Sequence, residues 1–393
     1  MNQPLNVCLL NDSFPPVIDG VANAVLNYAN VIQGGLGGAV VATPHYPMEN
    51  DNYSFPVIRY PSVKVPKTAG YRMGIPVASR IVREARRYDV NIIHSHCPFS
   101  ATVVSKSLRR AIGAPIILTY HTKFDIDIAN TLRTKHTRSI ALRFIVSNIK
   151  ACDEVWVVSP GAGENLRSIG YEGDYRVMGN GVDFPRGRCT EDEIAQISRE
   201  HGLEEDVPVF LFVGRMMWYK GIKIIIDGLR DVKAAGQRFK MIFIGSGSDF
   251  DEISACTAKY GMSDDCIFTG AIADRARLRA YFSRADLFLF PSTFDTNGLV
   301  VREAAACGLA SVLIRGSSAA EMICDGKNGI LIDEDPADLA AAVMQIAQNT
   351  GRAKEIGRHA MDELYISWDE AVATAYSRYY EVLEAYNKSR RKK

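Results

Sequence analysis

Short runs of almost wholly apolar residues alternate along this 393-residue chain with stretches of helical pattern. Strands that are apolar along their whole length are buried on both faces, as in parallel sheets covered by helices. The pattern therefore predicts βαβ units and doubly wound α/β sheets. The expected strands lie at residues 7–10, 91–94, 116–120, 155–159, 207–213, 240–244, 266–269, 286–290, 311–314 and 329–332, and the helices of the first half at 22–32 and 81–88.

The alternation runs through two successive sets, and the length is too great for one ordinary core. We therefore expect two Rossmann-like domains that face a central cleft. The boundary should lie in the turn-rich stretch 180–185, Asn-Gly-Val-Asp-Phe-Pro, where one set ends before the next begins. Residues 368–393 are helical in pattern, with recurring aromatic and aliphatic side chains.

Charge and cysteine usage narrow the class of protein. The net charge of +1 argues against nucleic acid as a partner. The eight cysteines are scattered without a CxxC pair, which favours buried free thiols in a reducing compartment over a disulfide framework. The first residues have no signal-peptide pattern, and no apolar run is long enough to span a bilayer. These features predict a cytoplasmic protein.

Two acids follow the expected strand 286–290. Asp295 lies in the loop, and Glu303 follows after seven intervening residues, about one turn into an expected helix that starts near Gly298. A helix N-terminus binds phosphate, and a carboxylate accepts hydrogen bonds from sugar hydroxyls. Because ligands of open α/β sheets bind beyond the carboxyl ends of the strands, the spacing suggests a nucleotide-sugar pocket.

Further motifs lie at other strand ends, and their order carries a resemblance. The phrase Gly-Arg-x4-Lys-Gly at 214–221, followed by Asp-x7-Glu-Ala-x2-Cys-Gly at 295–308, is similar to the retaining glycosyltransferases of family 4, which have the GT-B fold. The usual first Glu is replaced by Asp295, and the usual Pro-Phe by Thr296-Asn297. Three phrases in the first half match as well: Asp-Gly-Val at 19–21, Tyr-His-Thr at 120–122 and Asn-Gly-Val-Asp at 180–183.

The resemblance implies a division of labour. Residues 1–183 would form the acceptor-binding domain, residues 184–368 would bind a nucleotide sugar, and helix 369–393 would cross back to the first domain. It also implies transfer from the front face of the sugar, with the leaving diphosphate helping to deprotonate the acceptor. No metal or other cofactor is required. Closure of the domains would exclude water from the donor.

Arg215 and Lys220 are the expected clamp on the diphosphate, since two cations stabilise the charge that develops on the leaving group. Arg binds two phosphate oxygens and Lys adds a point charge. A solvated pair in an ordinary strand–helix loop is the alternative. The resemblance further implies that Glu303 binds the ribose, although an acid at a helix N-terminus is also common for structural reasons.

The remaining expected donor contacts also follow from the resemblance. Asp295 and His121 would approach the sugar, and Gly245 would lie near the base in a loop that could equally be an ordinary βα turn. The other donor-binding residues are Gly20, Asn297, Gly298, Leu299 and Val300. His94 and His96 lie on the same face of a strand and, with His121, could instead form a three-histidine zinc site, which the family does not need.

Basic residues of the first half, interleaved with apolar ones at 140–145, predict an amphipathic basic helix. Such a helix suits an anionic membrane surface, although a solvated helix over a core has the same pattern. The residues expected at the membrane or acceptor are Arg133, Lys135, Arg138 and Arg143. A second cluster, Lys106, Arg109 and Arg110, and the terminal run 390–393 add to the basic character. The enzyme would then be peripheral on the inner face of the cell membrane.

The phrases at 94–100 and 120–124 resemble those of bacterial transferases that glucosylate diacylglycerol. We therefore expect transfer of glucose from UDP-glucose to a lipid such as diacylglycerol. The same chemistry on a soluble sugar, a polysaccharide or another lipid stays open. A nucleotide-sugar epimerase and a non-enzymatic clamshell binding protein are more distant alternatives, the second disfavoured by the missing signal pattern.

Overall fold

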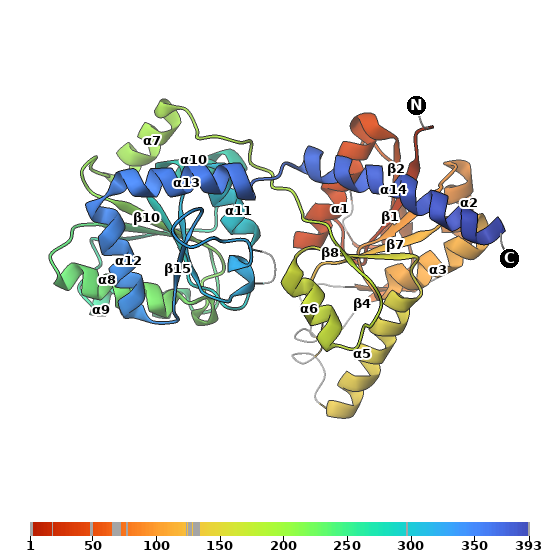
Figure 1. The fold of residues 1–393 in the computed structure, drawn as a ribbon, viewed down its shortest axis with the longest axis horizontal. Helices are drawn as coiled ribbons and strands as arrows, with labels where there is room; N and C mark the ends of the chain where they lie inside the picture. The colour runs from red at the N-terminus through yellow and green to blue at the C-terminus, as the bar shows by residue number, and fades with distance from the viewer. Residues whose placement is uncertain are drawn as a thin grey trace. The chain divides into compact units, whose positions relative to one another are not determined.

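The computed structural model describes residues 3–17, 19–47, 50–64, 72–75, 78–122, 124, 128, 134–295 and 298–391. The chain divides into two compact units. Unit 1 is Met1–Gly181 with Trp368–Lys393, and unit 2 is Val182–Ser367. Each unit contains a parallel sheet with helices on its faces (Figure 1). The prediction of two Rossmann-like α/β domains is confirmed.

The main sheet of unit 1 has seven parallel strands in the order β3-β2-β1-β6-β7-β8-β9. Strand order reverses between β1 and β6, so the carboxyl ends of these two strands border the position where open α/β sheets bind ligands. A separate antiparallel pair is formed by β4 and β5. The strands are β1 Asn6–Leu10, β2 Gly38–Pro44, β3 Val57–Tyr60, β4 Ser62–Lys64, β5 Arg72–Gly74, β6 Ile92–Ser95, β7 Ile116–Tyr120, β8 Glu154–Val157 and β9 Arg176–Val177.

Helices cover both faces of this sheet and create two separate cores. Alternate residues of β1 enter different cores: Val7 and Leu9 pack with α1 and α14, whereas Cys8 and Leu10 pack with α2 and α3. This follows from the period of two along a strand. The helices are α1 Gly20–Val31, its continuation η1 Ile32–Leu36, α2 Ala78–Arg87, α3 Ser100–Ile112, α5 Lys135–Lys150, α6 Pro160–Ser168 and α14 Trp368–Arg391.

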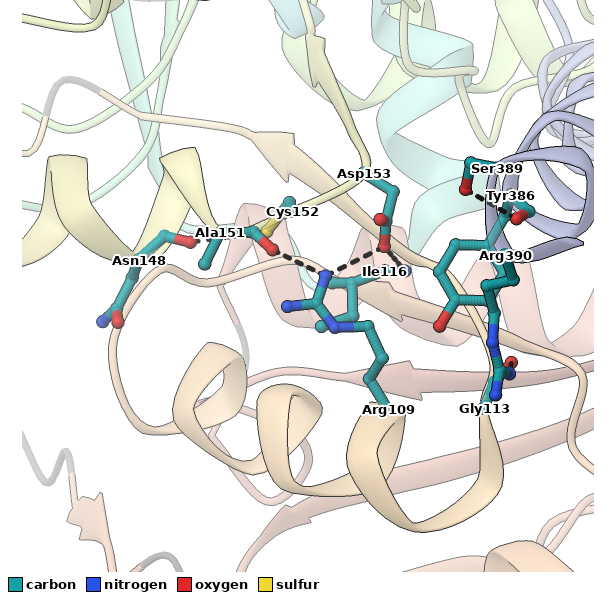
Figure 2. A network of polar contacts seen from close by, with 10 residues as sticks. All are labelled: Arg109, Gly113, Ile116, Asn148, Ala151, Cys152, Asp153, Tyr386, Ser389 and Arg390. Carbon is teal, nitrogen blue, oxygen red and sulfur yellow. Dashed lines mark hydrogen bonds and ion pairs between the residues drawn. The ribbon is translucent and has the colours of Figure 1, made fainter. Parts of the chain in front are cut away.

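Helix α14, drawn in blue in Figure 1, belongs to unit 1 although it follows unit 2 in the chain. The hydroxyl of Tyr376 accepts a hydrogen bond from the Leu5 amide at 2.6 Å, and the Arg378 guanidinium binds the Glu154 carboxylate at 2.6 and 2.9 Å. Near its end, Arg390 donates to the carbonyl of Gly113 at 3.2 Å (Figure 2). These bonds attach α14 to the amino-terminal ends of β1 and β8 and to the loop after α3.

Unit 2 has a six-stranded parallel sheet in the order β12-β11-β10-β13-β14-β15, which reverses between β10 and β13. One large core fills the unit. The strands are β10 Val209–Val213, β11 Lys240–Ile244, β12 Cys266–Gly270, β13 Leu287–Phe290, β14 Ser311–Ile314 and β15 Ile330–Ile332. The helices are α7 Glu191–His201, η2 Trp218–Lys220, α8 Ile222–Ala234, α9 Phe250–Lys259, α10 Arg275–Arg284, α11 Leu299–Ala306, η3 Ser318–Ala320, α12 Pro336–Gln348 and α13 Thr350–Leu364.

All eight cysteines lie within the described residues and are free thiols, five of them buried. Burial raises the pKa of the Cys8, Cys266 and Cys307 thiols to about 12, which keeps them protonated and unreactive. Among the helices that the structure describes, none combines the length and the apolar character needed to cross a bilayer.

Candidate active site

The loop after β10 in unit 2 packs backbone against backbone with the loop after β11. The amide of Met216 donates to the carbonyl of Ser246 at 3.0 Å. A Cβ atom on Gly245 would lie 1.8 Å from the carbonyl oxygen of Gly214, and Gly245 has a φ of 146°. Glycine is therefore required at residue 245 by packing alone. This close packing holds the Arg215 loop at the carboxyl end of the sheet.

Lys220 and Asp295, 75 residues apart in sequence, are in direct contact. The ammonium nitrogen of Lys220 lies 2.7 and 2.9 Å from the two carboxylate oxygens of Asp295, and the Ser292 hydroxyl donates to one of them at 2.6 Å. Lys220 is buried, with 6% of its surface exposed. Gly221 makes the contact possible, because a Cβ at that residue would lie 1.9 Å from the Pro291 carbonyl oxygen.

Two aromatic rings lie beside the predicted cations, and Lys220 contacts both of them. The rings of Tyr219 and Phe294 lie 4.6 Å apart between centroids and are 37% and 39% exposed. The Arg215 guanidinium lies 5.7 Å from the centroid of Tyr219, and the Lys220 nitrogen lies 5.6 Å from it. Arg215 and Lys220 are therefore brought to the same aromatic ring, at a distance at which cation–π attraction operates.

Glu303, on the second turn of α11, forms an ion pair with Arg275, the first residue of α10, at 2.5 Å. The same guanidinium lies 3.8 Å from the Asp183 carboxylate and stacks over the Phe184 ring at 4.5 Å. Burial raises the pKa of the Glu303 carboxyl, and Arg275 acts in the opposite direction. Only one carboxylate oxygen of Glu303 is hydrogen-bonded within the part of the chain that the structure describes, so the other is available to a ligand.

Helix α11 begins next to Asp295. Gly298 precedes it in the left-handed conformation, with a φ of 54°, and its carbonyl accepts from the amides of Val301 at 2.8 Å and Arg302 at 3.2 Å. The amides of Leu299 and Val300 belong to the first turn, which a helix cannot satisfy by itself. They suit the predicted contact with an anionic ligand. Asn297 lies outside the described residues.

In unit 1, His121 follows β7 and is buried. Its Nε2 atom lies 2.9 Å from Nδ1 of His96, and the two rings are stacked at 5.1 Å. His94 has both ring nitrogens occupied, by Tyr379 at 2.7 Å and by Thr119 at 2.7 Å. The three-histidine zinc site would need a free nitrogen on each ring, and His94 has none. Burial lowers the pKa of His121 to about 4, so this histidine is neutral at pH 7.

Gly20 is the first residue of α1, and the adjacent Asp19 caps the helix. One oxygen of Asp19 accepts hydrogen bonds from the amides of Val21 at 2.9 Å and Ala22 at 2.7 Å. A capping carboxylate satisfies amides that could otherwise bind an anion. Gly20 therefore lies at the start of a helix where the carboxylate of Asp19 already binds two of the first amides. Asp19 is also close enough to His121 to raise its pKa against the effect of burial.

The predicted basic helix is α5. Lys135 and Arg143 are exposed on it, Arg138 is half-buried, and Arg133 lies outside the described residues. Two exposed apolar side chains, Ile140 (50%) and Phe144 (47%), lie one turn apart on the same helix. They are separate from Ile145 and Ile149 of α5, which are buried in the core. Helix α5 thus has one apolar stripe in the core and a second apolar pair at the surface.

The basic cluster at 106–110 has a different role. Lys106 donates to the Asn148 side chain at 2.6 Å, which holds α3 to α5. Arg109 donates to the Ala151 carbonyl at 2.8 Å and to the Asp153 carboxylate at 3.1 Å (Figure 2). The same carboxylate accepts from the Ile116 amide at 2.8 Å. Two of the three cations in this cluster therefore connect elements of unit 1.

Comparison with known protein families decides the family. A model described as Glycosyltransferase Family 4 matches residues 18–186, and a model described as Glycosyl transferases group 1 matches residues 193–362. The chain belongs to the family 4 glycosyltransferases. The family model for the first half begins one residue before the cap of α1, and that for the second half includes Arg215, Lys220, Asp295 and Glu303.

Relatives of this family 4 glycosyltransferase have varied names. It is 27% identical over 342 residues to a GDP-mannose-dependent alpha-mannosyltransferase of Corynebacterium glutamicum, a match that covers 84% of this chain and 77% of that protein. It is 24% identical over 362 residues to an alpha-monoglucosyldiacylglycerol synthase of Acholeplasma laidlawii, covering 88% and 89%. The crystal structure of Anabaena HepE in complex with UDP-glucose superposes with a TM-score of 0.72 over 97% of this chain and 100% of that one, at 18% identity.

In the structure of this family 4 glycosyltransferase, several of the predicted site residues lie close together within unit 2. Lys220 contacts Asp295 directly, Arg215 shares the Tyr219 ring with Lys220, and Glu303 lies on the helix that starts beside Asp295. Sequence reasoning missed Arg275, because nothing in its surroundings in sequence distinguishes it from any residue at a helix start. It also missed Ser292 and Tyr219, which acquire their partners only in the folded chain.

Proposed function

We propose that this enzyme transfers glucose from UDP-glucose to a membrane lipid, diacylglycerol, with retention of configuration at the anomeric carbon. Unit 2 would bind the donor and unit 1 the acceptor. The observation that carries the proposal is the contact of buried Lys220 with Asp295, beside Arg215 and the start of α11. This places cations, a carboxylate and helix amides at the switch point of one parallel sheet, where a nucleotide sugar is expected to bind.

Arg215 and Lys220 would act on the leaving group. As the bond between the anomeric carbon and the diphosphate oxygen breaks, negative charge grows on the diphosphate, and fixed cations stabilise it. The acceptor oxygen forms its bond to the anomeric carbon on the same face, and its proton passes to the departing diphosphate. The incoming diphosphate would compete with Asp295 for the Lys220 ammonium group, so donor binding would free the Asp295 carboxylate for a sugar hydroxyl.

Glu303 would bind the ribose. Its free carboxylate oxygen can accept a hydroxyl hydrogen bond while Arg275 holds the other oxygen in place. The amides of Gly298, Leu299 and Val300, with Asn297, would face the sugar or the distal phosphate. His121 is neutral and would contact the sugar as a hydrogen-bonding group. A relative with bound UDP-glucose, HepE, supports a nucleotide-sugar donor, since its fold is similar over the whole chain.

A lipid acceptor is supported by α5 and by the relative named alpha-monoglucosyldiacylglycerol synthase. Ile140 and Phe144 would enter the lipid interface, and Lys135 and Arg143 would bind anionic headgroups. The enzyme would then work from the cytoplasm, as a peripheral protein on the inner face of the cell membrane. Another relative is named as a GDP-mannose-dependent transferase, so GDP-mannose is the alternative donor. A soluble sugar, a polysaccharide or another lipid is the alternative acceptor.

Release of free nucleotide tests the proposal. The full chain would be incubated with UDP-, GDP- and ADP-sugars, with and without vesicles that contain diacylglycerol. We expect UDP release from UDP-glucose that rises sharply with the vesicles, together with a glucosylated lipid whose anomeric configuration NMR identifies. Release that lipid leaves unchanged would point to a soluble acceptor. No turnover of any donor would overturn the proposed function.

A matched pair of variants tests the membrane surface separately. The double substitution Ile140→Glu with Phe144→Glu places two charges on the exposed apolar pair and should abolish co-sedimentation with anionic vesicles. The control is Thr137→Glu with Ser147→Glu, which adds the same charge to other exposed positions of α5. Equal binding by both double variants would remove α5 from the membrane contact.

A further inference from the structure

A chain of buried contacts links His121 to helix α14. The hydroxyl of Tyr379 lies 2.7 Å from Nδ1 of His94, and the Thr119 hydroxyl lies 2.7 Å from its Nε2. The ring of His94 lies over that of His96, with 4.0 Å between centroids. His96 then reaches His121 through Nδ1 at 2.9 Å. His96 is fully enclosed, and the transfer mechanism proposed above gives it no task.

The two nitrogens of His96 have unequal surroundings. Nδ1 faces Nε2 of His121, whereas Nε2 is buried and has no hydrogen-bond partner among the described residues. A neutral imidazole carries one proton, so one nitrogen donates and the other accepts. If His96 accepted the bond from His121, its own proton would sit on Nε2 as a buried donor without an acceptor. If His96 donates, Nε2 keeps only an unused lone pair.

The second arrangement costs less free energy, because an unpaired buried N–H group is the rarer defect in proteins. Both rings are neutral, since burial lowers the pKa of His96 and of His121. The bond therefore runs from Nδ1–H of His96 to a bare Nε2 of His121. The single proton of His121 must then lie on Nδ1, the ring nitrogen that His96 does not contact.

We propose that His96 is a positioning residue that fixes His121 in the Nδ1–H tautomer and so gives the site a hydrogen-bond donor. The group it would meet is a hydroxyl of the transferred hexose, which accepts that hydrogen bond. This last point rests on the proposed function, whereas the tautomer itself does not. His121 then orients the sugar and does not act as the base that receives the acceptor proton.

The tautomer can be measured without any substrate. Protein labelled with ¹⁵N in its histidines gives two-bond proton–nitrogen spectra that identify which ring nitrogen carries the proton, and His121→Gln assigns the His121 signals by their loss. We expect Nδ1 to be protonated in the wild-type protein. Protonation of Nε2 in the wild-type protein would overturn the inference. In His96→Leu, which imposes neither tautomer, the His121 signals should move towards a mixture.

Kinetics separate positioning from simple structural support. The amide of Asn can occupy the place of a histidine Nδ1–H, so His96→Asn should keep the donor to His121 and His96→Leu should remove it. We expect His96→Leu to lower kcat by about 10- to 100-fold, with a much smaller change in the KM of the donor sugar, since a slight misplacement of a contacting group costs that much. His96→Asn should recover most of the loss, and an equal loss in both variants would contradict the inference.

The two proposals fail separately. If His121→Gln transfers sugar as fast as the wild-type enzyme, His121 has no part in the reaction, which refutes its contact with the hexose. The wild-type spectrum still decides the tautomer in that case. If His96→Leu fails to fold, the wild-type spectrum and the activity of His96→Asn remain as tests, and loss of the Nδ1 proton signal in a folded, inactive His96→Asn would sink the idea.

Discussion

Asp295 shows how one methylene group alters a site at the scale of single residues. It stands where the family motif usually has Glu, and both of its carboxylate oxygens are bound to Lys220. The Ser292 hydroxyl donates a further hydrogen bond to one of these two oxygens. A longer Glu at this position would have to fold back to make the same two contacts. Asp295 therefore acts as a partner of Lys220 as well as a candidate sugar ligand, which sequence spacing alone did not suggest.

Removal of Lys220 should affect transfer far more than removal of a nearby surface lysine. We expect Lys220→Ala to lower kcat/KM by about 10²- to 10³-fold, the loss typical when one group that stabilises a developing charge is removed. The control is Lys223→Ala, three residues away, whose ammonium pairs with Asp227 at the surface. Its activity should stay within about twofold of the wild-type value, because exposed pairs contribute little. A folded Lys220→Ala enzyme with near-normal activity would exclude Lys220 from the site.

Arg275 should control the pH dependence of donor binding. Burial raises the pKa of Glu303 and Arg275 counteracts this, so Arg275→Ala should raise that pKa further. A protonated carboxyl accepts hydroxyl hydrogen bonds poorly, so the KM of the donor should rise as the pH falls. In Arg275→Ala this rise should begin at a higher pH than in the wild-type enzyme. Initial rates between pH 8 and pH 5 measure this. Arg277 is on the same helix as Arg275 and pairs with Glu200 of α7, so Arg277→Ala should leave the profile unchanged.

Many residues of the candidate site could be predicted from the sequence, but the side chains that contact them could not. Arg215, Lys220, Asp295 and Glu303 were named because the charges of a nucleotide sugar require such groups at strand ends. Their distribution among diphosphate, sugar and ribose remains a prediction. The direct bond between Lys220 and Asp295 depends on the approach of Gly221 to Pro291, a contact between distant loops that has no signature in either segment.

At the scale of elements, α14 covers one of the two cores of unit 1. Its side chains Val372, Ala375 and Tyr379 are completely buried against β1 and α1. Tyr379 also stacks on Trp156 of β8 at 5.5 Å between ring centroids and binds His94. The helix is therefore part of the packing of the first sheet, and the hydroxyl of Tyr379 connects it to His94.

The hydroxyl of Tyr379 should contribute more to the free energy of unfolding than an ordinary surface contact does. Tyr379→Phe leaves Nδ1 of His94 unpaired in the core, and we expect the free energy of unfolding to fall by about 1 to 3 kcal/mol. Urea unfolding followed by circular dichroism measures the change. Tyr386→Phe on the same helix, a residue only partly buried, is the matched control and should shift stability by less than about 0.5 kcal/mol. Similar losses in both variants would mean that the His94 bond contributes nothing specific.

Strands were predicted correctly where the chain has an uninterrupted apolar run. They were missed where glycines precede the strand or where the strand is short and exposed. The runs at 240–244 and 311–314 match β11 and β14, whose residues are almost all buried. Strand β2 was not predicted, because it begins at the last of four glycines in residues 34–38, a stretch that resembles a loop. Strand β9 has only two residues, both exposed, and exists because it pairs with the edge of β8. Such strands are specified by the sheet and not by their own residues.

At the scale of the whole molecule, the buried histidines of unit 1 should make the protein less stable in mild acid. Burial lowers the pKa of His94, His96 and His121 in the folded state, for His121 from 6.5 to about 4. Below pH 6.5 the unfolded chain therefore binds protons that the folded chain does not. Stability is then lost as the pH falls, by up to about 1.4 kcal/mol per pH unit for each such histidine.

Denaturant unfolding between pH 7.5 and pH 5 tests this expectation. His121→Gln should show a shallower loss, since the contribution of one histidine is removed. Burial raises the pKa of Asp12, which acts in the opposite direction because the folded carboxyl holds its proton more tightly. That contribution is common to both proteins and cancels in the comparison. Identical slopes in the two proteins would mean that His121 titrates in the folded state as it does in water.

The order of the elements along the chain also bears on synthesis at the ribosome. Unit 2 lies between the two segments of unit 1, so α14 leaves the exit tunnel only after all of Val182–Ser367. Until then, the core that contains Val7, Tyr28 and Trp156 lacks the side chains of α14, although unit 2 can already be folded. The nascent protein thus carries an open apolar face for as long as translation of unit 2 lasts, and chaperones that bind such faces have that interval in which to act.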